Sequence, residues 1–226
     1  DIHHDLNANL YAIVKLPFGF EYQMNFTPRY HWYEYMNHES AEHPEWAGDG
    51  GRSERKNEKT FNWQVDNILR WKKEFGEDHR VEATFLQNAE KGQWWKTVAQ
   101  NKLYSPSDIL GFHNIGAGTA PSVSSEDTYK TGDALMGRLF YSFKDKYMLT
   151  ASVRRDGYSA FGSMNPHAVF PAVALGWVFT SEKFMEKTSD WLNYGKLRFS
   201  WGQNGNRDIG QYEALAQLNS GAYTYV

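Results

Sequence analysis

Apolar side chains occupy every second position over long segments of the chain, and polar side chains fill the positions between them. One such run continues from Phe20 to Trp32 and ends there, because Glu34 would fall on the apolar face. A period of two residues is the signature of a β-strand whose two faces meet different surroundings. The alternation predicts about eight strands, in residues 8–16, 20–32, 61–71, 81–85, 135–143, 147–154, 169–179 and 197–201.

The two faces of the predicted strands differ in charge. The apolar faces hold no Asp, Glu, Lys, Arg or His. Residues 169–179 depart from the pattern, because one face carries large apolar side chains and the other carries small ones. The polar faces carry charged side chains, namely Lys15, Glu21, Arg29, Asp66, Arg70, Glu82, Arg138, Arg154 and Arg198. A slip of one residue would turn every side chain to the other face, so the register of the strands is strongly specified.

The lengths of the strands and connections favour a membrane barrel over a water-soluble core. Residues 20–32 would span about 43 Å at ~3.3 Å per residue, whereas strands in soluble proteins average about 5–6 residues. A tilted barrel strand crosses a bilayer in about 9–11 residues. Short connections at 17–19, 75–78 and 144–146 alternate with long ones at 33–59, 95–130 and 157–167. This layout is typical of an outer-membrane barrel, with short turns at one rim and long loops at the other.

Aromatic side chains gather near both predicted rims. Those near the short turns are Phe20, Trp71, Phe143, Tyr147, Trp177 and Phe179, and those near the long loops are Tyr30, Trp32, Phe61 and Trp63. Rings with a polar edge prefer the headgroup zone of a membrane, and aliphatic side chains prefer the hydrocarbon. A soluble sandwich that uses these rings as its core is the alternative. The connection after Phe179 is an exception to the short-turn layout, and there Ser181 is placed to cap a helical turn.

Composition excludes several classes of protein. The 226 residues carry a formal net charge of −3, and the near-neutral charge argues against nucleic acid as a partner. The absence of Cys excludes disulfides, thiolate metal sites and a Cys nucleophile. No stretch approaches the roughly 18 apolar residues of a transmembrane helix. The mean hydropathy of −0.69 is still compatible with barrel strands, since these expose one polar face.

No motif in the sequence supports a catalytic residue, a cofactor or a metal. His38 and His43 enclose two Glu residues, but their spacing of five misses the zinc pattern of two His four residues apart. The sequence around Gly116 and Gly118 lacks the third glycine and the strand–helix context of a phosphate loop. No Ser-His-Asp arrangement has local support. An enzyme is therefore the weakest interpretation.

Three tryptophans are the candidates for substrate or partner contact. Trp46, Trp94 and Trp95 lie in or beside the predicted long connections. Exposed rings at such places stack on sugars or anchor a partner protein, although packing within a loop or anchoring at the membrane rim is an equal alternative.

Three blocks of sequence follow one another in the second half of the chain. The first reads GRLFYSFKDKYMLTASVRRDG over residues 137–157, with SAFG at 159–162. The second is VFPAVALGW at 169–177, and the third is LRFSWGQNGN at 197–206, with DIG at 208–210. In this order the blocks resemble the SusC/RagA-like TonB-linked outer-membrane transporters of Bacteroidota. Residues 1–135 resemble the preceding hairpins of that family through alternation and loop layout alone.

The resemblance implies a nutrient importer in the bacterial outer membrane. Its barrel would have about 22 strands closed by a plug, and it would take up glycan fragments or peptides with energy from TonB and with a SusD-like surface lipoprotein. Residues 1–226 would form an internal part of the barrel domain, without the plug domain and the TonB-contacting segment. Two alternatives stay open: a soluble, aromatic-rich β module that binds carbohydrate, and a self-contained eight-stranded outer-membrane barrel whose first and last strands pair.

Overall fold

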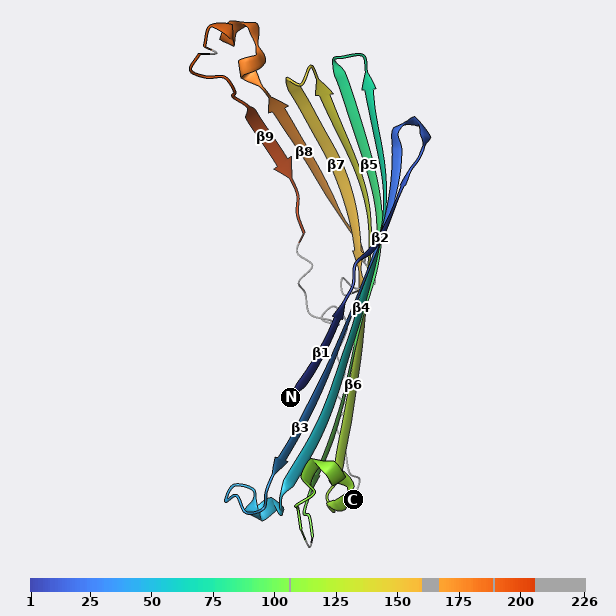
Figure 1. Cartoon of the computed structure of the whole chain (residues 1–226), viewed down its shortest axis with the longest axis vertical. Coiled ribbons are helices and arrows are strands. Elements are labelled where there is room, and N and C mark those ends of the chain that lie inside the picture. The colour runs from blue at the N-terminus through green and yellow to red at the C-terminus, as the bar shows by residue number, and fades with distance from the viewer. Residues whose placement is uncertain (106, 160–166, 189, 206–226) are drawn as a thin grey trace. The chain divides into compact units, whose positions relative to one another are not determined.

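A computed structural model describes residues 1–105, 107–159, 167–188 and 190–205. Within them one sheet has the strand order β1-β3-β4-β5-β6-β7-β8-β9, and β2 pairs with β3 (Figure 1). The strands are β1 Ile2–Asn7, β2 Leu10–Lys15, β3 Phe20–Glu39, β4 Arg52–Phe75, β5 His79–Lys102, β6 Ser122–Phe143, β7 Tyr147–Tyr158, β8 His167–Trp177 and β9 Leu197–Gly202. The connections contain the 3-10 helices η1 Pro17–Gly19, η2 Ala47–Asp49, η3 Gly111–Ala117, η5 Phe179–Ser181 and η6 Lys183–Thr188. The predicted all-β, antiparallel architecture is confirmed.

Contacts divide the chain into two compact units. Unit 1 comprises residues 1–9, 27–63 and 91–129, and unit 2 comprises residues 10–26, 64–90 and 130–226. Unit 1 contains the long connections 40–51 and 103–121. Unit 2 contains the short turns 17–19, 76–78 and 144–146.

Strands β1 and β2 are two parts of one strand that is interrupted opposite Pro28. Leu6 pairs with Tyr30 and Leu10 pairs with Phe26, so both parts keep the same register on β3. The Ala8 N–H donates to the Pro28 carbonyl (3.1 Å), but proline has no N–H with which to return the bond. The nine strands therefore occupy eight positions across the sheet, as the alternation predicted.

Several strands extend further than predicted. β3 ends at Glu39 rather than Trp32, β4 begins at Arg52 rather than Phe61, and β5 ends at Lys102 rather than at residue 85. Polar residues occupy both faces in these extensions, so the hydrophobic pattern stops although the backbone pairing continues. The long connections consequently shrink to residues 40–51 and 103–121. The predicted loop 157–167 falls largely outside the described residues.

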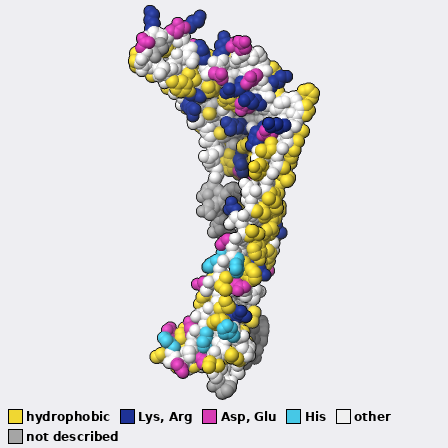
Figure 2. Space-filling view, in the orientation of Figure 1, with side chains coloured by type: hydrophobic (Ala, Val, Ile, Leu, Met, Phe, Trp, Pro, Cys, Tyr) yellow, Lys and Arg dark blue, Asp and Glu magenta, His cyan; other side chains and the backbone are white. Residues whose placement is uncertain are grey.

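In unit 2 the apolar positions of neighbouring strands line up on one face. Leu139 pairs with Ala151, which pairs with Val173, as the predicted register requires. Leu139 stays 47% exposed and Leu149 stays 38% exposed, because no second layer of described residues covers this face. Figure 2 shows hydrophobic side chains gathered in a strip that is separate from most of the charged ones. The buried hydrophobic residues in the described part are Tyr104, Ala134 and Val178, so the soluble-sandwich alternative is wrong.

The short turns of unit 2 are joined to one another. Lys144 and Asp145, at φ 54° and 50°, form the tight turn between β6 and β7. The Lys144 N–H donates to the Asp78 carbonyl (2.6 Å), and Arg80 forms an ion pair with Asp145 (3.5 Å). These contacts bind the β4–β5 turn to the β6–β7 turn.

The connection after β8 is helical, as predicted, but in 3-10 form. Ser181 is the last residue of η5 and does not stand at the start of η6, so it does not cap the second turn. Among the helices of the described residues, none has the length and hydrophobicity to cross a membrane.

Candidate functional site

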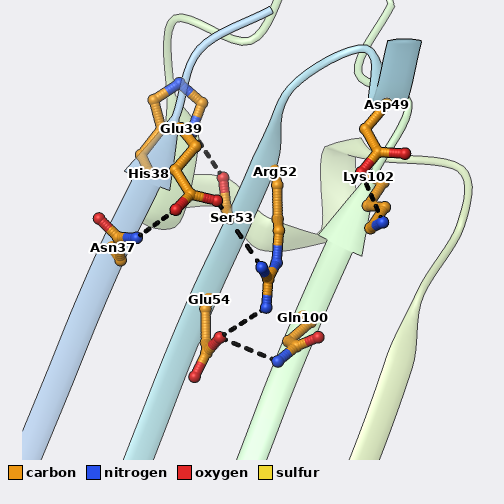
Figure 3. Close-up of polar contacts among 9 residues, drawn as sticks. All are labelled: Asn37, His38, Glu39, Asp49, Arg52, Ser53, Glu54, Gln100 and Lys102. Carbon is orange, nitrogen blue, oxygen red and sulfur yellow. Dashed lines mark hydrogen bonds and ion pairs between the residues drawn. The ribbon is translucent and has the colours of Figure 1, made fainter. Parts of the chain in front are cut away.

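Polar side chains of three strands meet in unit 1, where β3 ends and β4 begins (Figure 3). Arg52 forms ion pairs with Glu39 (3.8 Å) and Glu54 (3.1 Å). Gln100 of β5 donates to Glu54 (2.9 Å), and Asn37 donates to Glu39 (3.2 Å). We call these five residues the polar-face network. Each of its charges is compensated by a neighbour, so the network fixes the ends of the strands and presents a polar surface beside the long connections.

The two long connections of unit 1 are bonded to each other. The N–H groups of Leu103 and Tyr104 donate to the carbonyls of Asp49 (2.9 Å) and Gly50 (3.1 Å). Lys102 forms an ion pair with the Asp49 carboxylate (2.6 Å). Gly50 has φ 61°, and a Cβ there would lie 3.1 Å from the Leu103 Cα. A larger residue would therefore push the connections apart.

His38 holds residues 103–121 against the end of β3. Its Nδ1 lies 2.9 Å from the Ser53 Oγ, and its Nε2 lies 3.5 Å from the Asp108 Oδ2. Asp108 also accepts a hydrogen bond from the Ala41 N–H (2.8 Å), which holds the pKa of the Asp108 carboxyl below its ordinary value. The residues of a Ser-His-Asp triad thus meet although no local motif predicted it. Ser53 is 0% exposed, so its hydroxyl cannot reach a substrate, and the three residues serve to position the connection.

Aromatic rings lie beside charges on the polar side of β3. The Lys56 ammonium lies 4.9 Å from the centre of the Tyr33 ring and 5.5 Å from that of Tyr35. Lys56 also forms an ion pair with Glu58 (3.3 Å). Rings next to paired charges suit a ligand with both apolar and polar parts, such as a sugar or a peptide.

The structure separates the three predicted tryptophans. Trp46 lies in residues 40–51, with the Arg52 guanidinium 5.3 Å from the centre of its ring. Trp94 and Trp95 both lie inside β5, so the predicted start of the long connection at Trp95 is wrong, and Trp94 does not lie beside a connection. Successive residues of a strand point to opposite faces, so these two rings cannot lie against the same ligand. The predicted contact roles of all three remain predictions.

Trp95 lines a groove together with Tyr30 and Trp32, which belong to the apolar face of β3. Trp94 consequently points to the polar face. Both side chains are half-buried.

Charges on the polar face of unit 2 are also paired within the sheet. Arg154 donates to both carboxylate oxygens of Asp156 (2.8 and 2.9 Å). Arg70 donates to Glu21 (3.0 Å) and Gln23 (2.7 Å). These two arginines of the polar face are therefore compensated by carboxylates within the sheet.

The charge pattern of β4, rather than its hydrophobic pattern, could have predicted the polar-face network. Arg52, Glu54, Lys56 and Glu58 alternate in sign at every second position of β4. Opposite charges at that spacing share one face of a strand. The contact of His38 with Asp108 has no such signal, because it joins distant segments. In the described part of the chain, no group of three or more His, Asp or Glu side chains could hold a metal ion.

Comparisons with known proteins agree on one family. Residues 3–225 match the family described as TonB dependent receptor-like, beta-barrel. TonB-dependent receptor P39 of Formosa agariphila is 33% identical over 165 residues, which cover 72% of this chain and 16% of that protein. TonB-dependent receptor SusC of Bacteroides thetaiotaomicron is 33% identical over 132 residues, which cover 57% of this chain and 12% of that protein.

Solved structures show the same fold. The RagAB peptide transporter matches with a TM-score of 0.89 at 21% identity, over 99% of this chain and 25% of that one. The RagAB peptide importer in its open-open state matches with a TM-score of 0.86 at 21% identity, over 99% of this chain and 24% of that one. The chain thus spans 16% of the length of receptor P39 and a quarter of the length of the RagAB chain.

Proposed function

The chain belongs to the TonB-dependent receptor-like β-barrel family, and from that membership we propose that it forms part of the wall of an outer-membrane importer. The complete protein takes up nutrients, either peptides or glycan fragments. TonB supplies the energy, and a SusD-like surface lipoprotein is the partner. In this proposal the apolar face of the sheet meets lipid and the polar face lines the route of the cargo.

One observation carries the proposal: no layer of described residues covers the apolar face of unit 2. Leu139, Leu149 and Leu175 are between 38% and 51% exposed on neighbouring strands. Such a face is unfavourable in water, whereas the hydrocarbon of a membrane covers it. A hydrogen-bonded sheet is also the structure that hydrocarbon tolerates, because its backbone groups are paired.

The polar side of unit 1 is our candidate surface for cargo. Tyr33, Tyr35 and Trp94 supply rings there, and Trp46 lies in the neighbouring connection, where cargo or the lipoprotein would approach. The solved relative RagAB is a peptide transporter, which supports peptides as cargo. Ring faces also stack on sugars, which supports glycan fragments. For Trp95 the outward groove favours contact with the membrane rather than with cargo.

The test of the energised route is uptake by cells that carry the full-length protein. Labelled oligopeptides and oligosaccharides are supplied to cells with and without TonB. We expect uptake of one cargo class to be lost without TonB, while the amount of protein in the outer membrane stays constant. Uptake that continues without TonB would contradict the proposal.

The test of the cargo surface compares two adjacent tryptophans. We expect Trp94→Ala to reduce uptake by about ten-fold, since losing the stacking of one ring costs on the order of 1–1.5 kcal/mol. Trp95→Ala is the matched control and should leave uptake unchanged. Co-purification of the lipoprotein with Trp46→Ala shows whether that ring contacts the partner instead. Equal uptake by all three variants and by the unmodified protein would remove these rings from the cargo surface.

A further inference from the structure

A groove lies on the outward face of unit 1, on the side opposite to the candidate surface for cargo. Its volume is about 660 Å³, and it lies across three strands. It is lined by Tyr30 and Trp32 of β3, Asn57 and Lys59 of β4, and Trp95 and Thr97 of β5.

The outward position of the groove follows from alternation along the strands. Tyr30 and Trp32 end the apolar run of β3. On β4, Lys59 is two residues from Phe61, whose ring lies 6.4 Å from the Tyr30 ring. Alternate residues of a strand share a face, so the outward side of β4 changes from aromatic to cationic between Phe61 and Lys59. Such a change marks the depth at which hydrocarbon gives way to headgroups.

Among the described residues, Lys59 and Arg55 of this face have no carboxylate partner. The Lys59 ammonium is exposed and lies 5.5 Å from the centre of the Trp32 ring. Arg55 is also exposed and donates to the Met36 sulfur (3.5 Å). No described carboxylate lies within the 4.0 Å of an ion pair from either cation, and this includes Glu34, which shares their face.

Cations on the other face of β4 and β5 differ in this respect. Lys56 is paired with Glu58 (3.3 Å), and Arg52 is paired with Glu54 (3.1 Å). On β5, Lys96 is paired with Glu126 of β6 (4.0 Å). Positive charge is therefore left uncompensated on the outward face, where the aromatic groove lies, and an anionic group would balance it.

We propose that this groove binds the phosphorylated sugar headgroup of an outer-leaflet glycolipid. The proposal rests on the membrane location in the proposed function, with the long connections outside the cell. The rings of Trp32 and Trp95 stack on the sugar, and the Lys59 ammonium pairs with its phosphate. The hydroxyl of Thr97 and the amide of Asn57 supply hydrogen bonds to sugar hydroxyls.

The experiment uses the full-length protein in detergent and three probes: diphosphorylated lipid A, dephosphorylated lipid A and inorganic phosphate. Lys59→Gln is compared with Lys56→Gln, which removes the same charge from the opposite face of β4. We expect Lys59→Gln to weaken binding of diphosphorylated lipid A about five-fold, the factor for loss of one cation near an anionic surface. Lys56→Gln should not change it. Arg55→Gln is a second variant of the same face and should act in the same direction as Lys59→Gln.

Three outcomes would contradict the proposed glycolipid site. Equal effects of Lys59→Gln and Lys56→Gln would show a general loss of charge rather than a site. Equal binding of lipid A with and without phosphates would exclude the ion pair, and competition by inorganic phosphate at the concentration of the lipid would indicate a site for the free ion. Cargo uptake by the Lys59→Gln protein should stay normal. Absence of the unmodified protein from the outer membrane would contradict the proposed function itself.

Discussion

At the scale of single residues, the medium that a side chain meets depends on its position in the register. Leu139 of β6 pairs with Ala151, and the adjacent Phe140 pairs with Thr150. Leu139 therefore belongs to the apolar face, and Thr150 belongs to the polar one. The sequence predicted this assignment because the face that contains Leu139 carries no charged residue, whereas the other face does. It could not predict which of the polar side chains pair with one another, since those contacts depend on the register between strands.

A charge placed on each face tests this assignment. We expect Leu139→Arg to lower the free energy of unfolding of the membrane-embedded protein by about 2 kcal/mol or more, because an arginine facing hydrocarbon is costly. Thr150→Arg should cost less than about 1 kcal/mol, since it faces the aqueous side. The measurement is the denaturant midpoint of the full-length protein folded into lipid vesicles. Similar costs at the two positions would contradict the outward orientation of Leu139.

Asp108 gives a prediction of pH dependence. The pKa of its carboxyl is lowered from the ordinary 3.8, chiefly by the hydrogen bond from the Ala41 N–H. A lowered pKa in the folded state means that the stabilisation is fully present above the ordinary value and is lost as the pH falls through the folded value. We expect the Ala41 amide to stay protected from hydrogen exchange from pH 7 to about 4 and to lose that protection at lower pH. Asp108→Ala should lose the protection at every pH, and Ser107→Ala is the control that should keep it.

At the scale of elements, the strands continue beyond the region in which their pattern can be read. The alternation located the part of β3 that has one apolar face but not its last seven residues, 33–39. Outside a membrane both faces meet polar surroundings, so hydrophobicity carries no information there although the backbone bonds continue. For this reason the hydrophobic pattern places Trp95 at the start of a connection and Trp94 beside it, although both belong to β5. The opposite charges of Arg52 and Glu54, two residues apart, could have predicted that β4 continues beyond its hydrophobic part.

Pro28 offers a test of the interrupted strand. We expect Pro28→Ala to supply the missing N–H opposite Ala8 and to join β1 and β2 into one strand. The gain of a hydrogen bond, about 0.5–1.5 kcal/mol, is offset by the lost rigidity of proline in the unfolded chain, so the net stability should change by less than about 1 kcal/mol. The readout is hydrogen exchange, in which the new amide at position 28 should be strongly protected. Rapid exchange there would show that another constraint separates the two strands.

At the scale of the whole molecule, the alternation of short and long connections sets the orientation in the proposed membrane. Antiparallel neighbours place successive connections at opposite ends of the strands. From the proposed function we expect residues 40–51 and 103–121 to face the outside of the cell, and residues 17–19, 76–78 and 144–146 to face the periplasm. The contacts of His38 and Lys102 that hold the long connections together could not be predicted, because each joins segments far apart in the sequence.

A protease site inserted into one connection at a time tests the orientation. We expect a site in residues 103–121 to be cleaved in intact cells. A site in residues 76–78 should be cleaved after the outer membrane has been made permeable and not before. Import activity of each inserted protein serves as the control for folding. The reverse pattern would place the long connections in the periplasm.

Trp94 and Trp95 are adjacent in β5 and point to opposite faces, and this limits how many residues the strand can gain or lose. Removal of one residue between His79 and Gln93 would exchange the surroundings of Trp94 and Trp95 and would do the same to every residue after them in the strand. Removal of two would restore the assignment. Natural deletions and insertions in these strands should therefore come in even numbers, whereas this restriction to even numbers does not apply to the connections at 40–51 and 103–121. Evolution of a new cargo preference is then expected to proceed by changing connections and by substitution within strands, and seldom by single-residue edits of the wall.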